Sequence, residues 1–372
     1  MQYKNILVTG GAGFIGSYLV DLLVEKGYTV TILDNLEEQV HQGKKPAYLN
    51  KKPRFIKGDI RDNGILKKAL KDADVIYHLA SAVGVAQSNY EIQKYADTNV
   101  SATASLLDLI VNSKLPIKKI ISVSSMTGYG EGNYICKTCG IVRPPTRSQE
   151  QLNKKKWELL CPKCKKEVKP APTDETAQEY PNSVYAITKK AQTDILMTIG
   201  QIYQIPTVLL KLFNVYGPRQ SLSNPYTGVT AIFTSRIKNN QPALLYEDGL
   251  QTRDFVSVHD VARALVLALE SNKADYETLN IGSGIPTPIK EIAQTLAREL
   301  GKPGFVEVTG NSRVNDTRHC FADIKKAKRL LSWSPQVKLK DGIKELVEWG
   351  KKEEANDSFD VAQQELKRKG LA

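Results

Sequence analysis

The chain has 372 residues, of which 41% are hydrophobic and 25% are charged. This composition is typical of a folded globular protein and excludes a disordered or fibrous one. No window approaches the roughly 18 apolar residues that cross a bilayer, so we expect no membrane partner. The first residues run directly into a predicted strand without a signal peptide, which favours the cytoplasm. The net charge of +12 leaves nucleic acid open as a partner.

The excess charge is concentrated in one segment. Residues Tyr134–Pro170 hold ten basic and three acidic side chains, a net charge of +7, while the rest of the chain carries +5. Four of the five cysteines lie in the same segment. We therefore interpret residues 131–172 as an insertion and analyse the remaining sequence without it.

The N-terminal residues predict a strand, a glycine turn, a helix and a second strand. The strand is Asn5–Thr9, the helix is Ser17–Lys26 with Gly27 as its stop, and the second strand, Tyr28–Leu33, ends in Asp34. Glycines let the turn approach a pyrophosphate closely, and a helix N-terminus favours the anion. The turn residues predicted to bind a dinucleotide are Gly10, Gly13, Phe14, Ile15 and Gly16.

Asp34 indicates which dinucleotide is bound. It lies 18 residues beyond Gly16, where a carboxylate accepts hydrogen bonds from the ribose hydroxyls and repels a 2′-phosphate. No arginine or lysine follows at Asn35 or Leu36 to offset that repulsion. The pattern predicts NAD rather than NADP. A glycine motif alone would be read as an ordinary tight turn, but here strand, helix, strand and acid all occur in register.

The alternation of strands and helices continues along the chain. Three further strands are predicted, Phe55–Ile56, Val75–Leu79 and Ile120–Val123. Ligands of such sheets bind beyond the carboxyl ends of the strands, which is where Asp59, Ala80 and Ser125 lie. If only its own strand were considered, Asp59 would be interpreted as a turn residue. The pattern predicts an α/β fold, a doubly wound parallel sheet of the Rossmann type.

The remaining sequence completes the predicted domain organisation. Residues 1–215, interrupted by the insertion, form the dinucleotide-binding domain, and residues 216–372 form a smaller α/β substrate domain. Helices are predicted at Val258–Leu269 and Ile289–Leu300, and Leu279–Gly284 is expected to return to the main sheet. Lys351–Ala372 alternates lysine and glutamate and predicts a polar tail helix or a frayed end.

Ser125, Tyr185 and Lys189 are the candidate catalytic set. Tyr185 and Lys189 lie one helical turn apart on one face, and a nearby cation lowers a tyrosine pKa, so that the pair acts as a base. A tyrosine and a lysine four residues apart are also expected by chance in a chain with 16 tyrosines. The position of this pair, after a strand that ends in Ser125 and in a chain with a nucleotide turn, makes it a candidate.

These motifs together resemble the extended short-chain dehydrogenase/reductase family that acts on nucleotide sugars. The matching motifs are Thr9–Gly16, Asp34, Gly58–Asp62, His78–Ala80, Asn99, Ser124–Ser125, Tyr185 with Lys189, Phe213–Pro218, Arg253–Phe255 and Asn280–Gly284. They occur in the order of the family through most of the chain. Lys211 stands where many members have arginine, a minor departure.

The resemblance implies roles for individual residues. Besides the glycine turn, the residues implied to contact NAD are Asp34, Asn35, Asp59, Ile60, Leu79, Ala80, Ala82, Asn99, Ser124, Tyr185 and Lys189. Ser125 and Thr127 are implied to face the sugar. The residues implied to hold the nucleotide and its diphosphate are Asn214, Val229, Arg253, Arg313 and Asp316. An arginine fork suits a diphosphate, although any single arginine is otherwise a solvated surface charge.

The residues after Ser125 favour one reaction of this family. Members that eliminate water or lose carbon dioxide usually carry a glutamate two residues after the active-site Ser or Thr, and many dehydratases have an aspartate before it. This chain has Thr127 and Met126 at these two positions. Without an acid there, a leaving hydroxyl is hard to protonate. We therefore predict a 4-epimerase that passes through a 4-keto sugar, with Tyr185 as the base and Ser125 and Thr127 on the oxyanion. A decarboxylase, a dehydratase or a net dehydrogenase is the alternative.

The insertion predicts a structural zinc site. Cys136 and Cys139 form one Cys-x-x-Cys pair, Cys161 and Cys164 form another, and 21 residues separate the pairs. Four thiolates at this spacing are typical of tetrahedral zinc, with no open position for catalysis. So short a segment is expected to have no core of its own and to need the metal to fold. Free thiols or two disulfides are the alternatives, and Cys320 is expected to be a small core residue.

A four-cysteine insert at this place is similar to that of dTDP-L-rhamnose 4-epimerases. The supporting stretches are Arg143–Pro145, Trp157–Glu158, Ser223–Val229 and Arg318–Asp323. The insert is expected to cover the active site as a lid or to join a subunit interface, and the resemblance implies a homodimer. A non-catalytic NAD-binding regulator whose ribbon contacts nucleic acid is a second hypothesis, which the catalytic set and the scarcity of aromatic residues in the insert disfavour.

Overall fold

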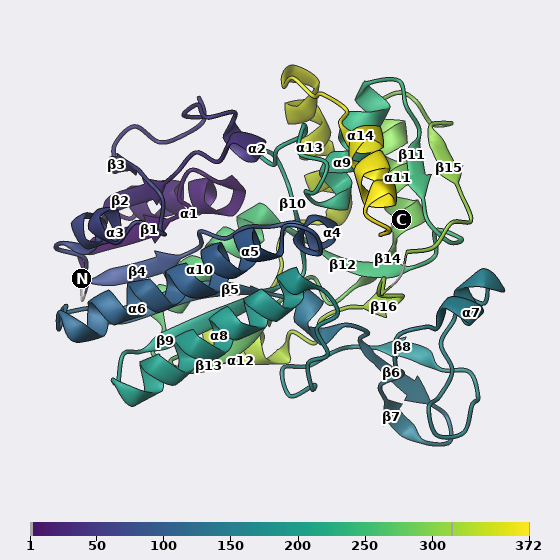
Figure 1. Ribbon diagram of the computed structural model, residues 1–372, viewed down its shortest axis with the longest axis horizontal. Coiled ribbons are helices and arrows are strands. Elements are labelled where there is room, and N and C mark those ends of the chain that lie inside the picture. Colours follow the sequence, from purple (N-terminus) through teal and green to yellow (C-terminus); the bar gives the residue numbers. More distant parts are fainter. Residues whose placement is uncertain (1–2, 314, 372) are drawn as a thin grey trace.

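The computed structural model describes residues 3–313 and 315–371. A seven-stranded parallel sheet forms its centre, with helices on both faces (Figure 1). The strand order is β13-β9-β5-β4-β1-β2-β3. The bounds are β1 (Asn5–Thr9), β2 (Thr29–Asp34), β3 (Arg54–Lys57), β4 (Val75–His78), β5 (Lys119–Ser125), β9 (Thr207–Leu212) and β13 (Glu277–Ile281). The predicted α/β fold with a doubly wound parallel sheet is confirmed.

Apolar runs explain why this sheet is buried on both faces. Ile6 and Val8 of β1 pack into one core and Leu7 into the other, because successive side chains of a strand point to opposite faces. Helices α1 (Phe14–Glu25), α10 (Val258–Glu270) and α12 (Lys325–Leu331) cover the first core. Helices α3 (Asn63–Leu70), α6 (Ala102–Asn112) and α8 (Val184–Ile202) cover the second.

Helix α1 begins three residues before its predicted start. Gly13 is its N-cap residue, so the helix follows the glycine turn at once. Gly27, with a φ of 85°, ends it as predicted. The shorter elements of this part are α2 (Glu38–His41), α4 (Val85–Ser88), α5 (Ile92–Tyr95), a π-helix (Ala96–Ser101) and a 3₁₀-helix (Met126–Tyr129).

The C-terminal part of the chain surrounds a third core. Its sheets contain β10 (Asn214–Tyr216), β12 (Thr252–Ser257), β14 (Pro286–Pro288) and β16 (His319–Cys320), and separately β11 (Ala243–Leu245) and β15 (Val306–Val308). Its helices are α9 (Val229–Lys238), α11 (Ile289–Glu299), α13 (Leu339–Lys352) and α14 (Phe359–Arg368). As expected, the segment before Gly282 returns to the main sheet, because β13 pairs with β9.

The C-terminal segment is not simply a polar or frayed tail. Helix α14 buries Phe359, Ala362 and Leu366 on one face, while Arg236 of α9 forms ion pairs with Asp357 and Asp360. The tail prediction was therefore wrong in part: the apolar residues recur at helical spacing and dock the helix. Ala372 lies outside the described residues.

The insertion folds as a small antiparallel sheet that projects from one end of the molecule (Figure 1). Its strands are β6 (Asn133–Cys136), β7 (Gly140–Val142) and β8 (Lys169–Ala171), in the order β7-β6-β8. The short helix α7 (Gln149–Asn153) lies between β7 and β8 in the sequence. Pairing of β6 with β8 brings the two ends of the insertion together. The expectation that it has no core is wrong, because five buried side chains cluster there: Tyr134, Cys136, Val142, Leu159 and Cys161.

No helix within residues 3–313 and 315–371 is long and apolar enough to cross a bilayer.

Candidate active site

The glycine turn between β1 and α1 forms a cradle for an anion. A Cβ on Gly10, whose φ is 71°, would lie 2.8 Å from the amide nitrogen of Ala80, and a Cβ on Gly16 would lie 2.2 Å from the carbonyl oxygen of Gly10. Only glycine fits such approaches. The N-terminus of α1 has no side-chain cap and no acid in its first turn, so its free N–H groups suit a diphosphate. Phe14 and Ile15 open this helix.

Two carboxylates lie at the carboxyl ends of neighbouring strands: Asp34 is the last residue of β2, and Asp59 lies two residues beyond β3. Buried Asp34 accepts hydrogen bonds from the amides of Ala12 (3.0 Å) and Leu36 (2.9 Å). Asp59 accepts from the Asn35 amide (3.0 Å) and from the guanidinium of Arg61 (2.8 Å). The hydrogen bonds from Arg61 lower the pKa of Asp59 to about 2.

The structure thus brings together Asp34, Asn35 and Asp59 at the sheet edge expected for the adenosine, with buried Ile60 next to them in sequence. Arg61 was missed by the sequence analysis. Its signal was the spacing of two residues from Asp59, which allows one side chain to reach the other.

Asn99 joins the loop after β4 to helix α8. Its buried amide accepts from the Ala82 N–H (2.8 Å) and donates to the Ala82 carbonyl and to the Thr188 hydroxyl (3.1 Å each). The amide of Ala80 donates to the Thr9 hydroxyl (3.2 Å). The predicted residues Leu79, Ala80 and Ala82 therefore lie in a loop held in place from both sides.

Ser125, Thr127 and Tyr185 meet at the carboxyl end of β5. The Thr127 hydroxyl donates to the Ser125 hydroxyl (2.9 Å), while the Tyr185 amide donates to the Ser88 hydroxyl (2.9 Å). Burial raises the pKa of Tyr185, and a hydrogen bond with Ser125 partly offsets it. Ser124, the preceding residue, accepts from the hydroxyl of Thr193 on α8 (2.8 Å).

Lys189 begins a buried polar chain that the sequence analysis missed. Burial lowers its pKa to about 7, and its ammonium donates to the Gln192 side-chain oxygen. The Gln192 amide donates to the Thr103 hydroxyl (2.9 Å), which lies 2.9 Å from His78 Nε2. His78 Nδ1 lies 2.9 Å from the Thr9 hydroxyl. The available signal was the i, i+3 spacing of Lys189 and Gln192.

A carboxylate does lie near the turn after Ser125, although not in the sequence position considered above. Glu179 forms an ion pair with buried Lys211, and a Cβ on Gly128 would lie 2.6 Å from a Glu179 oxygen. The Lys211 ammonium also lies 4.2 Å from the centre of the Tyr129 ring. The Lys211 ammonium therefore engages the one carboxylate described at this turn.

In the C-terminal part of the chain, Arg253 and Asp316 are in direct contact. The Arg253 guanidinium donates to an Asp316 carboxylate oxygen (3.0 Å) and to the Thr317 carbonyl (2.6 Å). Arg313 instead lies 3.9 Å above the ring of Tyr246. Asn214 has a buried side-chain oxygen without a partner among the described residues, which fits a ligand donor. Val229 is the first residue of α9.

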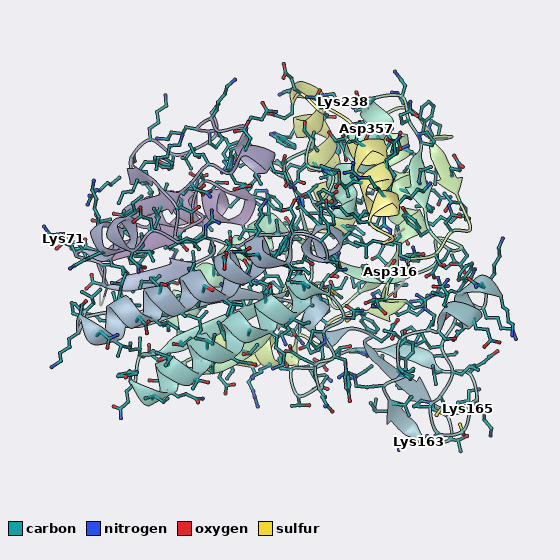
Figure 2. The ribbon with its side chains drawn as sticks, viewed as in Figure 1. Lys71, Lys163, Lys165, Lys238, Asp316 and Asp357 are labelled. Carbon is teal, nitrogen blue, oxygen red and sulfur yellow. The ribbon has the colours of Figure 1, made fainter. Side chains whose placement is uncertain are left out.

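The four cysteines of the insertion converge. Their sulfur atoms all lie within 4.8 Å of one another, and Cys136 Sγ is 3.5 Å from Cys164 Sγ. All four are free; a disulfide requires about 2.05 Å, so the two-disulfide alternative is not present. The set fits a tetrahedral thiolate site, whose bonds are about 2.3 Å long. Figure 2 shows Lys163 and Lys165 at this outer end of the insertion.

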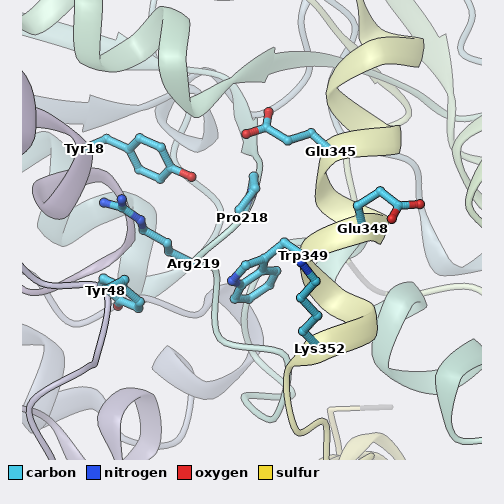
Figure 3. A pocket seen from close by; sticks show the side chains of 8 residues that line it. All are labelled: Tyr18, Tyr48, Pro218, Arg219, Glu345, Glu348, Trp349 and Lys352. Carbon is cyan, nitrogen blue, oxygen red and sulfur yellow. The ribbon is translucent and has the colours of Figure 1, made fainter.

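A cavity of about 390 Å³ lies elsewhere, between α13 and the surface of the NAD-binding side (Figure 3). Arg219 stacks over the rings of Tyr18 (4.3 Å) and Tyr48 (5.2 Å) at one wall, and Trp349 lines the other. None of its lining residues is a predicted site residue.

Comparison with known proteins places the chain in a family. Residues 6–156 match the NAD dependent epimerase/dehydratase family, and residues 167–346 match the GDP-mannose 4,6 dehydratase model. The chain is 37% identical to the dTDP-L-rhamnose 4-epimerase of Burkholderia thailandensis over 349 residues, which cover 93% of this chain and 94% of that protein.

Two solved structures are similar over nearly the whole chain. The UDP-glucose 4-epimerase of Thermotoga maritima with UDP-glucose is 32% identical, with a TM-score of 0.77 over 94% of this chain and 99% of that one. The UDP-glucuronic acid 4-epimerase of Bacillus cereus, in complex with UDP-glucuronic acid and NAD, is 30% identical, with a TM-score of 0.74 over 93% and 99%. The resemblance predicted from the motifs is thus confirmed: the chain belongs to the NAD dependent epimerase/dehydratase family.

Proposed function

We propose that the protein is an NAD-dependent nucleotide-sugar 4-epimerase whose substrate is dTDP-L-rhamnose or a related nucleoside-diphosphate hexose. The observation that carries this proposal is the meeting of Ser125, Thr127 and Tyr185 in a chain with a dinucleotide turn, with Thr127 where members that eliminate water carry a glutamate. The similarity to the dTDP-L-rhamnose 4-epimerase supports the choice of sugar.

The proposed mechanism assigns one task to each of these residues. The Lys189 ammonium stabilises the phenolate of Tyr185, which takes the proton of the carbon-4 hydroxyl and becomes the neutral phenol. Ser125 and Thr127 donate to the oxygen that becomes the 4-keto group. NAD would be held by the glycine turn, Asp34 and Asp59, and would supply a hydride acceptor and donor at carbon 4. Arg253 and Asn214 hold the nucleotide end.

A dehydratase or decarboxylase is the second candidate, because the family includes dehydratases. Glu179 contacts the turn after Ser125 at Gly128, but the Lys211 ammonium engages its carboxylate. This favours epimerisation over loss of water.

The finer features of the proposal concern metal, assembly and location. The four cysteines would hold a structural zinc ion that fixes the insertion and supplies no chemistry. Ile187 and Ile202 of α8 are 53% and 65% exposed, which supports a homodimer through the long helices. Five free thiols suit the reducing cytoplasm.

Incubation with a panel of dTDP-, UDP-, GDP- and CDP-sugars tests the function. We expect interconversion at carbon 4 of at least one sugar, read by NMR, with no net change in bound NAD. Accumulation of a 4-keto-6-deoxy sugar or of carbon dioxide would instead support the second candidate. No turnover of any of them by protein that contains NAD would contradict both.

Gln192→Leu should displace the pH profile of turnover. The lost hydrogen bond favours the uncharged amine of Lys189, so the phenolate of Tyr185 loses stabilisation and the effective pKa of the tyrosine rises. One hydrogen bond, worth about 1 kcal/mol, corresponds to a shift of the acidic limb of about 0.7 pH unit upward. Lys190→Ala, which removes an exposed i, i+4 ion pair in the same helix, is the control. An unshifted limb would show that Gln192 does not act through Lys189.

A further inference from the structure

A group of charged residues attaches the insertion to the C-terminal part of the chain. This group, here called the anchor cluster, consists of Arg147 and Glu158 of the insertion and of Glu247, Asp248 and Arg318 of the C-terminal part. The side chain of Arg318 is 0% exposed. It donates to Glu158 (2.5 Å), Glu247 (2.9 Å) and Asp248 (2.7 Å). Arg147 pairs with Glu247 (2.8 Å), and both side chains are 2% exposed. Buried charges of this kind cost much when one partner is removed.

The loop of residues 316–319 lies between the anchor cluster and Arg253. From the insertion, Arg147 donates to the Asp316 carbonyl (2.9 Å). From the other side, Arg253 donates to the Thr317 carbonyl, to the Asp316 carboxylate and to the Arg318 carbonyl (3.2 Å). In Figure 2, Asp316 lies close to where the insertion meets the body. One loop therefore contacts the insertion and the arginine assigned to the nucleotide.

A second link fixes the same loop from the base of the insertion. Glu131, only 5% exposed, accepts from the amides of Arg318 (2.8 Å) and His319 (3.3 Å). It also accepts from the hydroxyl of Tyr134 on β6 (2.9 Å). The fold of the insertion and the backbone of the loop are thus joined by direct hydrogen bonds.

We propose that Arg147 and Glu158 are positioning residues for the nucleotide end of the substrate. The inference rests on the proposed function, which assigns Arg253 and Asp316 to the nucleoside diphosphate. With the loop held, the Arg253 fork is ordered before the ligand arrives, and binding does not have to order it. Without Arg147, the Asp316 carbonyl and the Glu247 carboxylate lose a buried partner, and the loop loses its support.

Another arginine of the insertion provides an internal comparison. Arg143 donates to the carbonyls of Tyr129 and Glu131 (2.9 Å each), so it contacts the turn that carries Thr127. Arg147 contacts the loop that carries Asp316. The two arginines therefore reach the reacting end and the nucleotide end of the site, respectively. Loss of Arg147 should raise KM, whereas loss of Arg143 should lower kcat.

The test compares Arg147→Ala and Glu158→Ala with the wild-type protein. Affinity for dTDP and for UDP is measured by calorimetry on protein with NAD bound, and kcat and KM are measured with the sugar that is turned over. We expect Arg147→Ala to bind the preferred diphosphate at least about tenfold more weakly, with a matching rise in KM and little change in kcat. Glu158→Ala, whose side chain is 58% exposed, should show a smaller change.

Conservative variants and a control separate positioning from general damage. Glu158→Gln keeps acceptor and size and should restore most of the affinity, and Arg147→Lys should restore part of it. Lys154→Ala removes an exposed ion pair of helix α7 in the same insertion and should change nothing. NAD content and zinc content should remain at the wild-type level in each variant.

Each result decides the inference. If Arg147→Ala does not fold, Glu158→Ala and Glu158→Gln carry the same comparison. Unchanged affinity in variants of a protein that binds a diphosphate would overturn the positioning role alone and leave the proposed function standing. A fall in kcat with KM unchanged would also overturn it. A wild-type protein that binds neither dTDP nor UDP would overturn this inference together with the proposed substrate class.

Discussion

Tyr185→Phe should lower turnover of the nucleotide sugar by about 10²–10⁴-fold, the usual contribution of a general base. The substitution removes one hydroxyl and keeps the ring, which packs edge-on against Tyr95 with centroids 6.4 Å apart. KM should change little, because the nucleotide end is bound elsewhere, at Arg253 and Asn214. The measurement is steady-state kinetics together with the NAD content of the purified protein.

Tyr203→Phe is the matched control, since Tyr203 lies at the end of the same helix and is 51% exposed. It should leave both rate and NAD content unchanged. A Tyr185→Phe protein that retains a tenth or more of wild-type turnover would remove Tyr185 from the role of base. Loss of NAD in that variant would instead assign the hydroxyl to cofactor binding.

The central sheet and the glycine turn were predictable because their signals are local. The strand predicted at Asn5–Thr9 has the bounds observed for β1, since an apolar run between a polar start and a glycine marks both ends. The stop at Gly27 follows from one residue whose backbone adopts a positive φ at little cost. Such signals need no knowledge of the partner strand or helix.

Contacts across long sequence separations could not be predicted in the same way. Lys211 and Glu179 are 32 residues apart, and Arg318 and Glu158 are 160 apart. Charged residues in a sequence resemble solvated surface, and the sequence analysis gave Arg147 no role of its own. Arg147 counted there as one of ten positive charges, yet its side chain is 2% exposed. Only the folded chain separates it from the lysines at the outer end of the insertion.

For the C-terminal helix α14 the signal was local, but the prediction still failed in part. The period of Phe359, Ala362 and Leu366 was present in the sequence, at intervals of three and four residues. The many lysines and glutamates around them favoured a polar tail. When a helix has one narrow apolar face among many charges, the sequence alone does not show whether another element covers that face.

Cys161→Ser should remove the metal and unfold the insertion while leaving the NAD-binding side intact. Cys161 is fully buried in the small core of the insertion, and a structural zinc site of this kind supplies most of the folding free energy of such a module. Zinc content should fall from about one ion per chain to none. NAD content should not change, because no residue of the glycine turn contacts the insertion among the hydrogen bonds described above.

Turnover of Cys161→Ser at low substrate should fall by at least about tenfold, because unfolding removes the contacts of Arg147 and Glu158 with the loop of residues 316–319. Lys137→Ala changes an exposed residue between Cys136 and Cys139 and should keep both metal and rate. Full turnover by a Cys161→Ser protein without zinc would mean that the substrate loop does not depend on the fold of the insertion. Retained zinc with full turnover would mean that three thiolates suffice, and Cys136→Ser with Cys161→Ser would then be needed to release the metal.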